Sequence, residues 1–224
     1  MRMGRLAGAP LLALCLAAPS ARSEELPTRF EAAVRAAVGI PIGNAVGETT
    51  RSPNGTSLAD LVAWTVPLEL ELGARIGPAF VGGYLSYAFG KTGSALEGGT
   101  ARSASDVRVG FEMLWHLGPD HPVDPWVGLG VGYEWLDLSI TGSGGTLYGS
   151  VRGFEWVNLQ LGIDFLLGRS FRLGPFVQSR VGQYDTGSLG LINAQGTDSS
   201  GTSDIPSKAV HVWIDFGLRF AFLL

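Results

Sequence analysis

Three observations in the sequence predict an all-β fold, namely a transmembrane antiparallel up-and-down barrel of eight strands. Apolar and polar residues alternate with a period of two in eight separate segments. The connections between these segments alternate between short and long. Beyond the first 23 residues, no stretch approaches the roughly 18 consecutive apolar residues of a membrane-spanning helix. Insertion into a membrane would therefore require strands.

The first two segments differ in how clearly their pattern identifies a strand. In residues 29–43 the apolar side chains from Phe30 to Ile42 alternate with a face that carries charge, but several of them also fit a helical spacing. The stretch GIPIG at the end of this segment and the strand pattern of the other segments favour a strand there. In residues 61–75 the stretch VPLELEL alternates strictly, which excludes a helix.

The third and fourth segments, residues 79–90 and 105–117, continue the alternation without a break. The odd-numbered positions from Val81 to Phe89 carry most of the large apolar side chains of the third segment, opposite glycine, tyrosine and serine. The odd-numbered positions from Val107 to Trp115 do the same in the fourth, opposite charged residues and histidine. Both patterns are typical of strands whose two faces meet different surroundings.

The fifth and sixth segments, residues 126–136 and 152–167, each contain an irregularity. In the fifth, apolar residues alternate with glycines up to Trp135, and the next two residues then invert the pattern. We expect the membrane-crossing part to end there. In the sixth, Glu155 falls on the apolar face and its two aromatic neighbours fall on the polar one, which indicates a β-bulge in VRGFEW.

The last two segments, residues 171–183 and 209–224, complete the even number that an outer-membrane barrel requires. In the seventh, Pro175 is the one residue that disfavours a strand, because proline cannot donate a ladder hydrogen bond. The long connections are residues 44–60, 91–104, 137–151 and 184–208. We expect these loops to face the outside, and the short turns and both chain ends to face the periplasm.

Aromatic residues on the apolar face fall into two belts, as expected of side chains at the two membrane interfaces. The belt near the long loops contains Trp64, Tyr87, Phe89, Tyr133 and Trp135. The belt near the short turns contains Trp115, Phe165, Phe171, Phe220 and Phe222.

The opposite face of the strands carries charge and must turn inward. A charged side chain that faces lipid near the midplane costs up to roughly 2 to 4 kcal/mol, and this face has many. The predicted lumen network comprises eight acids and eight bases: Arg29, Glu31, Arg35, Glu69, Glu71, Arg75, Asp106, Arg108, Glu112, Glu134, Arg152, Asp164, Arg172, Arg180, Asp215 and Arg219. An eight-stranded barrel holds only its own side chains, so we expect a packed, formally neutral ionic plug.

Strand order and depth suggest partners within this network. They pair Arg35 with Glu69 or Glu71, Glu31 with Arg219, Arg108 and Arg152 with Glu134, and Asp164 with Arg172. Glycines on the same face are expected to make room for the long arginine side chains.

The main alternative fold is a soluble barrel of the lipocalin kind, with the charged face outward. The only two lysines, Lys91 and Lys208, both lie at loops, which disfavours it.

The N-terminus predicts export. Residues 1–23 place Arg2 and Arg5 before a short apolar stretch and end in Ala-Arg-Ser, which is typical of a cleaved secretory signal peptide. Residues 24–28 form a short periplasmic segment, and residues 29–224 form the barrel. The only cysteine, Cys15, lies in the signal peptide, so no disulfide is expected. The remaining chain has 13 basic and 20 acidic residues, which argues against a nucleic-acid partner.

The C-terminal stretch VWIDFGLRFAFLL, together with the eight-strand pattern, resembles the small outer-membrane barrels of the OmpA, OmpX and OmpW kind. The resemblance implies an integral protein of the bacterial outer membrane that contacts outer-membrane lipid and lipopolysaccharide. It also implies that the barrel-assembly machinery recognises the last strand. One departure is Leu224, where this group usually ends in phenylalanine.

No motif predicts a catalytic residue, a cofactor or a metal site. Three scattered histidines lack ligand spacing, and GLGVG at 128–132 belongs to a strand. We therefore predict a non-enzymatic barrel with an envelope-structural or surface-interaction role, which passes very small solutes at most. The alternative is an enzyme that modifies lipid A through the rim around His211, with Ser207 and Asp204 nearby.

Overall fold

A computed structural model describes residues 28–224 except 51, 97–100 and 169. The signal peptide expected at 1–23 and residues 24–27 lie outside the described residues. The long strands are β1 (Thr28–Val46), β3 (Val62–Ile76), β4 (Ala79–Thr92), β5 (Ala101–His116), β6 (Val123–Gly142), β7 (Gly145–Leu167), β8 (Phe171–Asn193) and β10 (Val210–Leu223). The short elements are β2 (Thr56–Ser57), α1 (Leu58–Leu61), the 3-10 helix η1 (Ser94–Leu96) and β9 (Asp198–Asp204).

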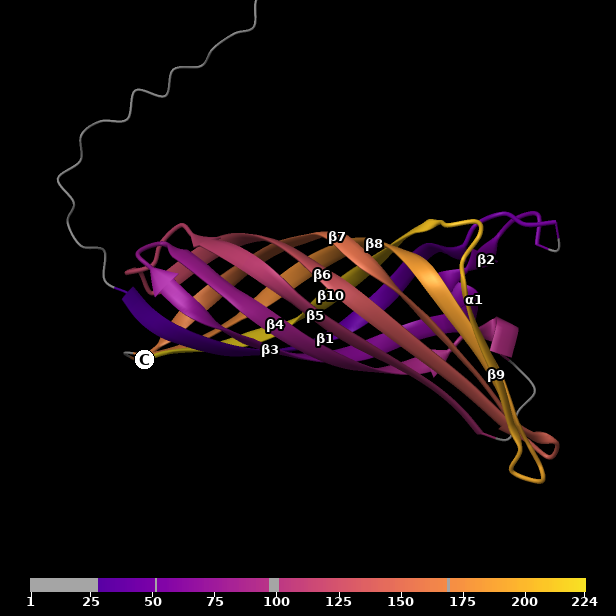
Figure 1. The fold of residues 1–224 in the computed structure, drawn as a ribbon. Coiled ribbons are helices and arrows are strands. Elements are labelled where there is room, and N and C mark those ends of the chain that lie inside the picture. The colour runs from indigo at the N-terminus through magenta and orange to yellow at the C-terminus, as the bar shows by residue number, and fades with distance from the viewer. Residues whose placement is uncertain (1–27, 51, 97–100, 169) are drawn as a thin grey trace, which may run out of the picture.

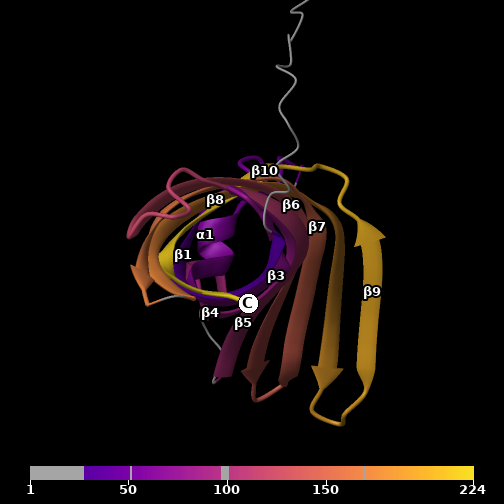
Figure 2. The same ribbon diagram turned by 90° about the vertical axis from the view of Figure 1, so that its left-hand side faces the viewer.

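The eight long strands form a closed antiparallel ring. Each pairs with its neighbour in chain order, and β10 pairs with both β1 and β8, which closes the sheet. Figure 2 shows this ring seen along its axis. The predicted eight-stranded barrel is confirmed, and residues 29–43 form a strand rather than a helix. Closure leaves no open edge within the ring, so its backbone polar groups are satisfied where lipid offers no partner.

The two ends of the barrel differ. At the turn end, three short connections follow β3, β5 and β7, and the start of β1 lies beside the end of β10 (Figure 1). The hairpin end, at the opposite side of Figure 1, carries β2, α1, η1 and β9. No helix in the described part of the chain is long and apolar enough to cross a bilayer.

Two expected long loops are strand instead, which corrects the sequence prediction for residues 137–151 and 184–208. β6 and β7 continue to a tight turn at residues 143–144, and β8 continues to Asn193 and pairs with β9. Apolar and polar residues still alternate there, but most of the apolar side chains now lie on the inner face and most of the polar ones on the outer face. We call this extension, residues 137–142, 145–151, 186–193 and 198–204, the flap; it projects beyond the ring on one side (Figures 1 and 2).

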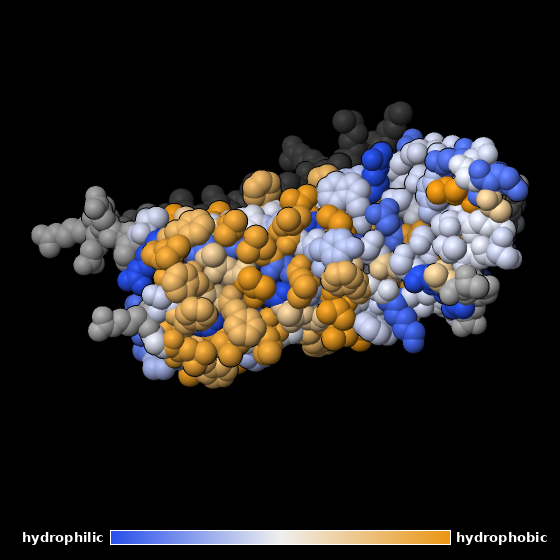
Figure 3. Space-filling view, turned by 90° about the horizontal axis from the view of Figure 1, so that it is seen from below, coloured by the Kyte–Doolittle hydropathy of each residue, from blue (hydrophilic) through white to orange (hydrophobic). Residues whose placement is uncertain are grey.

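The outer wall of the barrel is apolar. Exposed leucine, valine, isoleucine and phenylalanine side chains cover it, including Phe111 at 75% exposure. Figure 3 shows this hydrophobic surface over the part nearest the turn end, and a hydrophilic surface at the hairpin end. All ten predicted belt aromatics lie on this face, at least partly exposed. An apolar belt of this extent around a closed ring is a lipid-facing surface.

Candidate functional site: the buried network of the lumen

The lumen is filled with buried charged side chains. Among the residues that the structure describes, ten carboxylates and six arginines are at most 4% exposed. The arginines are Arg35, Arg75, Arg108, Arg172, Arg180 and Arg219, and the acids are Glu31, Glu69, Glu71, Asp106, Glu112, Asp124, Glu134, Glu155, Asp164 and Asp215. The expected formal neutrality is therefore wrong, because acids exceed arginines by four.

Half of the imbalance has a local cause in β7. The bulge anticipated in VRGFEW is present: β7 carries one extra residue against both neighbours between Glu155 and Asn158. One extra residue reverses the faces of all positions before it. Arg152, expected beside Glu134, therefore points outward and is exposed, whereas Glu155 points inward at 1% exposure. Arg29 lies exposed at the turn end.

Arg219 on β10 joins three strands near the turn end. Its guanidinium donates hydrogen bonds to Glu31 on β1 at 2.6 Å and to Glu71 on β3 at 3.0 Å. It also donates to Asp164 on β7 at 2.8 Å. The expected pair of Glu31 with Arg219 is therefore brought together, whereas Asp164 pairs with Arg219 rather than with Arg172.

Arg35 on β1 occupies the middle of the lumen. Its Nη1 lies 2.8 Å from Glu69 and 3.3 Å from Glu112, and its Nε contacts Glu71. Its guanidinium lies over the Trp126 ring, with 5.4 Å between Cζ and the ring centroid. Both partners that the sequence suggested for Arg35 are in contact with it.

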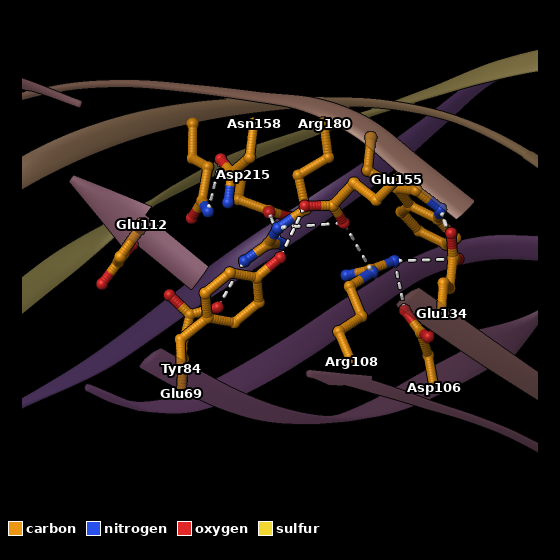
Figure 4. Close-up of polar contacts among 12 residues, drawn as sticks. Glu69, Tyr84, Asp106, Arg108, Glu112, Glu134, Glu155, Asn158, Arg180 and Asp215 are labelled. Atoms are coloured by element: carbon orange, nitrogen blue, oxygen red, sulfur yellow. Dashed lines mark hydrogen bonds and ion pairs between the residues drawn. The ribbon is translucent and has the colours of Figure 1, made fainter. Parts of the chain in front are cut away.

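Two further arginines form the part of the network nearer the hairpin end (Figure 4). Arg180 on β8 donates to Glu69 at 2.5 Å and to Asp215. Arg108 on β5 pairs with Asp106 and lies 3.1 Å from Glu134. Glu155 lies between the two arginines, 3.7 Å from each. The network is thus continuous from strand to strand across the barrel.

Glu134 gathers donors from three sides. Its carboxylate accepts hydrogen bonds from the Tyr184 hydroxyl at 2.7 Å and from the Trp213 indole at 2.9 Å. His211 Nε2 lies 3.0 Å from it, and the imidazole stacks on the Tyr184 ring at 4.1 Å between centroids. The sequence placed His211 at the rim of the barrel; its side chain is instead 1% exposed and contacts Glu134 in the lumen.

A second carboxylate that the sequence analysis missed lies at the turn end. Asp124 accepts hydrogen bonds from Arg172 and from the backbone N–H of Gly118, and it lies 2.8 Å from His116 Nδ1. Arg75 is 3.7 Å away. Asp124 shares the inward face with residues further along β6, so extending the alternation back into the expected turn would have found it.

Four of the inward-facing glycines, Gly82, Gly110, Gly132 and Gly162, lie against aromatic side chains rather than arginines, which corrects the expectation for them. A Cβ at Gly162 would lie 2.3 Å from the Trp126 ring, and one at Gly110 would lie 2.6 Å from the Tyr84 ring. Both rings therefore lie flat on the wall at positions without side chains. Tyr84 then donates to Glu155 at 2.8 Å, which orders the inward carboxylate of the bulge.

An apolar cluster, the cap, closes the hairpin end of the lumen. Leu58 of α1 is fully buried in it, and Figure 2 shows α1 within the ring. The cap residues come from several elements around the ring: Ala45, Leu58, Val62, Ala104, Leu136, Tyr184, Ile205 and Trp213. Trp213 lies over Arg108 at 4.9 Å and so joins the cap to the charged network.

The lumen holds little free space. A hollow between Arg35, Glu69, Arg180 and Asp215 is too small for a water molecule. At the turn end, a hollow of about 220 Å³ is lined in part by Arg29, and it opens toward the short turns. In the part of the chain that the structure describes, no group of three or more His, Cys, Asp or Glu side chains has the geometry to hold a metal ion.

Comparison with solved structures identifies bacterial outer-membrane proteins. A major outer membrane protein from Thermus thermophilus matches with a TM-score of 0.52 at 14% identity, over 87% of this chain and 99% of that chain. The fold is that of an integral outer-membrane β-barrel. Neisserial surface protein A matches at a TM-score of 0.44 and 10% identity, over 86% of this chain and 95% of that chain. AlkL, an outer membrane protein studied in lipid bilayers, matches with a TM-score of 0.48 at 13% identity, over 92% of this chain and 96% of that chain.

No family model and no curated protein matches the sequence. The similarity to the Thermus thermophilus protein supports the fold that the strand pattern predicted. Membership of the narrower OmpA, OmpX and OmpW group stays a prediction.

Proposed function

We propose that this protein is a non-enzymatic outer-membrane barrel that is closed to general solutes and acts at the cell envelope through its flap. The observation that carries the proposal is the combination of the lumen network with the cap. Charged side chains from strands that are not neighbours in the ring meet across the lumen, and the apolar cap covers the hairpin end. A lumen filled in this way admits very small solutes at most.

The flap supports a role in surface interaction. Its inner face, which continues the cap, carries Leu147, Leu189 and Leu191 at 41%, 62% and 47% exposure. Its outer face is polar except for Ile192, and a hydrogen bond from the Tyr148 hydroxyl to Asp198 at 2.6 Å links two of its strands. Exposed apolar side chains grouped on one wall of a polar extension are typical of a contact surface. Short turns face the periplasm in such barrels, so the flap is extracellular.

Single-channel recording in planar bilayers tests closure. We expect no stable conductance step comparable with that of a general porin. A variant in which both Arg35 and Arg180 are replaced by alanine removes the two guanidiniums that contact Glu69. Because the cap stays in place and the carboxylates remain, we expect that variant to show small, cation-selective steps at most. Stable large steps from the wild-type protein would contradict the proposal.

The role of the flap is tested in cells. We expect a strain in which Leu189 and Leu191 are both replaced by serine to share the envelope-stress phenotype of the deletion strain, while its barrel is still inserted. A matched control replaces the outward, polar Ser188 and Ser200 by alanine. A phenotype that follows the control, or that appears only on loss of the whole barrel, would argue for a purely structural role.

The enzymatic alternative is tested by mass spectrometry of lipid A from cells that carry the wild-type protein or His211→Ala. The buried imidazole is held between Glu134 and Tyr184, and Asp204 is exposed on β9, so no catalytic group is gathered at the surface there. We expect the two lipid profiles to be the same. A change confined to wild-type cells would favour the enzyme.

We also propose that β10 carries the signal for the barrel-assembly machinery. The Leu224 side chain is 67% exposed, and its backbone N–H donates to Phe30 at 2.8 Å. Leu224→Phe is expected to raise the rate of insertion into the membrane and to leave the stability of the inserted barrel unchanged. Insertion assays with purified assembly machinery, compared with spontaneous folding into vesicles, separate the two effects.

A further inference from the structure

A groove on the outer wall of the barrel is lined by both aromatic and cationic side chains. The groove has a volume of about 580 Å³ and lies at the hairpin end of β3, β4 and β5. Its lining includes Trp64, Val66, Phe89, Lys91, Thr92 and Arg102. The groove is distinct from the lumen network, since none of these residues belongs to it.

The groove opens where two strands part. Ladder pairing between β4 and β5 ends at Gly90 and Ala104, and the strands diverge beyond that point. Lys91 pairs in register with Trp64 on β3, and it follows Phe89 by two positions on β4. Side chains two apart on a strand share a face, so the Lys91 side chain lies on the same face as Phe89.

The depth of the groove matches the boundary between lipid tails and headgroups. Trp64 and Phe89 belong to the aromatic belt and are 43% and 58% exposed. Aromatic belts mark the level of the headgroups, so the two cations sit at or just beyond that level. Acyl chains can lie against the aromatic floor while a headgroup meets the cationic edge.

The cations of the groove have no anion of their own among the described residues. All ion pairs found in the described residues lie in the lumen, and none includes Lys91 or Arg102. Both side chains are exposed. Lys91 and Arg102 line the same groove, and both groups bind phosphate well, the guanidinium through paired hydrogen bonds and the ammonium as a point charge.

We propose that this groove binds the phosphate of a phosphorylated lipid of the outer leaflet, with Lys91 and Arg102 on the phosphate and Trp64 and Phe89 on an acyl chain. The charge of the groove is complementary to such a headgroup, and its apolar floor is complementary to the tail. This inference concerns the outer wall alone. It holds whether or not the lumen passes solutes.

The test titrates diphosphorylated lipid A into the purified, detergent-solubilised protein and counts bound lipid by native mass spectrometry. The variant replaces Lys91 and Arg102 by glutamine. Each cation near an anionic lipid surface strengthens binding roughly fivefold, so losing two is expected to weaken binding about 30-fold. The matched control replaces Arg152 and Lys208 by glutamine, which removes the same net charge outside the groove, and should bind as the wild type does.

Three further arms decide the ligand class. Exchanging the two cations, as Lys91→Arg with Arg102→Lys, should preserve binding, and far-UV circular dichroism should show the same fold in every variant. Dephosphorylated lipid A should bind as weakly to the wild type as intact lipid A does to the glutamine variant. Equal loss in variant and control, equal binding of the dephosphorylated lipid, or displacement of the lipid by equimolar inorganic phosphate would each overturn the proposal.

Discussion

Replacing Arg219 by alanine tests whether the lumen network stabilises the barrel. Arg219 is fully buried and donates to Glu31, Glu71 and Asp164 at 2.6, 3.0 and 2.8 Å. Glu31 and Glu71 each keep a second arginine partner in its absence. Asp164 has no other arginine within ion-pair distance in the described part of the chain. The substitution therefore leaves one buried carboxylate without a cation.

The expected loss in the free energy of unfolding follows from that single carboxylate. Removing one partner of a buried ion pair costs roughly 3–5 kcal/mol, because the remaining charge is buried and uncompensated. Urea unfolding of the barrel in lipid vesicles, followed by tryptophan fluorescence, measures the loss. Adding Asp164→Asn should restore most of it, because a neutral amide needs no cation. Adding Glu71→Gln should restore less, because Glu71 retains Arg35.

Arg152→Ala is the matched control for Arg219→Ala. The alternation in the sequence assigns Arg152 to the lumen, but the bulge in β7 turns its side chain outward. An exposed substitution of this kind is expected to change the free energy of unfolding by no more than about 0.5 kcal/mol. Equal losses in the two variants, or equal rescue by Glu71→Gln and Asp164→Asn, would refute the reasoning.

Three other outcomes are expected. Gly162→Ala should lower the free energy of unfolding by about 1–3 kcal/mol, because its Cβ would lie 2.3 Å from the Trp126 ring; urea unfolding measures this. Leu58→Ala should cost about 2–5 kcal/mol by leaving a cavity in the cap, and the same measurement applies. The hydrogen bond to Asp198 raises the pKa of Tyr148, so its contribution is present at neutral pH and is lost as pH rises through that raised value. Alkaline absorbance titration should show a lower tyrosine pKa in Asp198→Asn.

The barrel itself could be predicted from the sequence because its two faces meet opposite environments. In β3, for example, Leu68 and Leu70 are 47% and 43% exposed, whereas Glu69 and Glu71 are at most 3% exposed. Strict alternation over such a stretch leaves no other assignment. The same alternation identified eight of the ten buried acids, and six of the eight proposed bases are buried in the lumen.

The other features of the lumen could not be predicted, because alternation assigns each side chain to a face of its strand but does not show where the strand shifts register against its neighbours. The extra residue of β7 reversed the assignment of Arg152, and only the misplacement of Glu155 in the pattern pointed to it. The flap was missed because its polarity inverts beyond Leu136 while its backbone ladder continues unchanged. The position of His211 against Glu134 depends on how strands distant in sequence meet, which no local pattern contains.

The bond between Arg219 and Glu31 spans 188 residues and links the last strand to the first. A nascent sheet that lacks β10 therefore holds Glu31 on β1 and Asp164 on β7 without their common cation. A slip of one position in the docking of β10 would turn Arg219 toward the hydrocarbon, at up to roughly 2 to 4 kcal/mol near the midplane. Sealing of the cylinder and matching of its internal charges are consequently one event, and only the native alignment of the final strand achieves both.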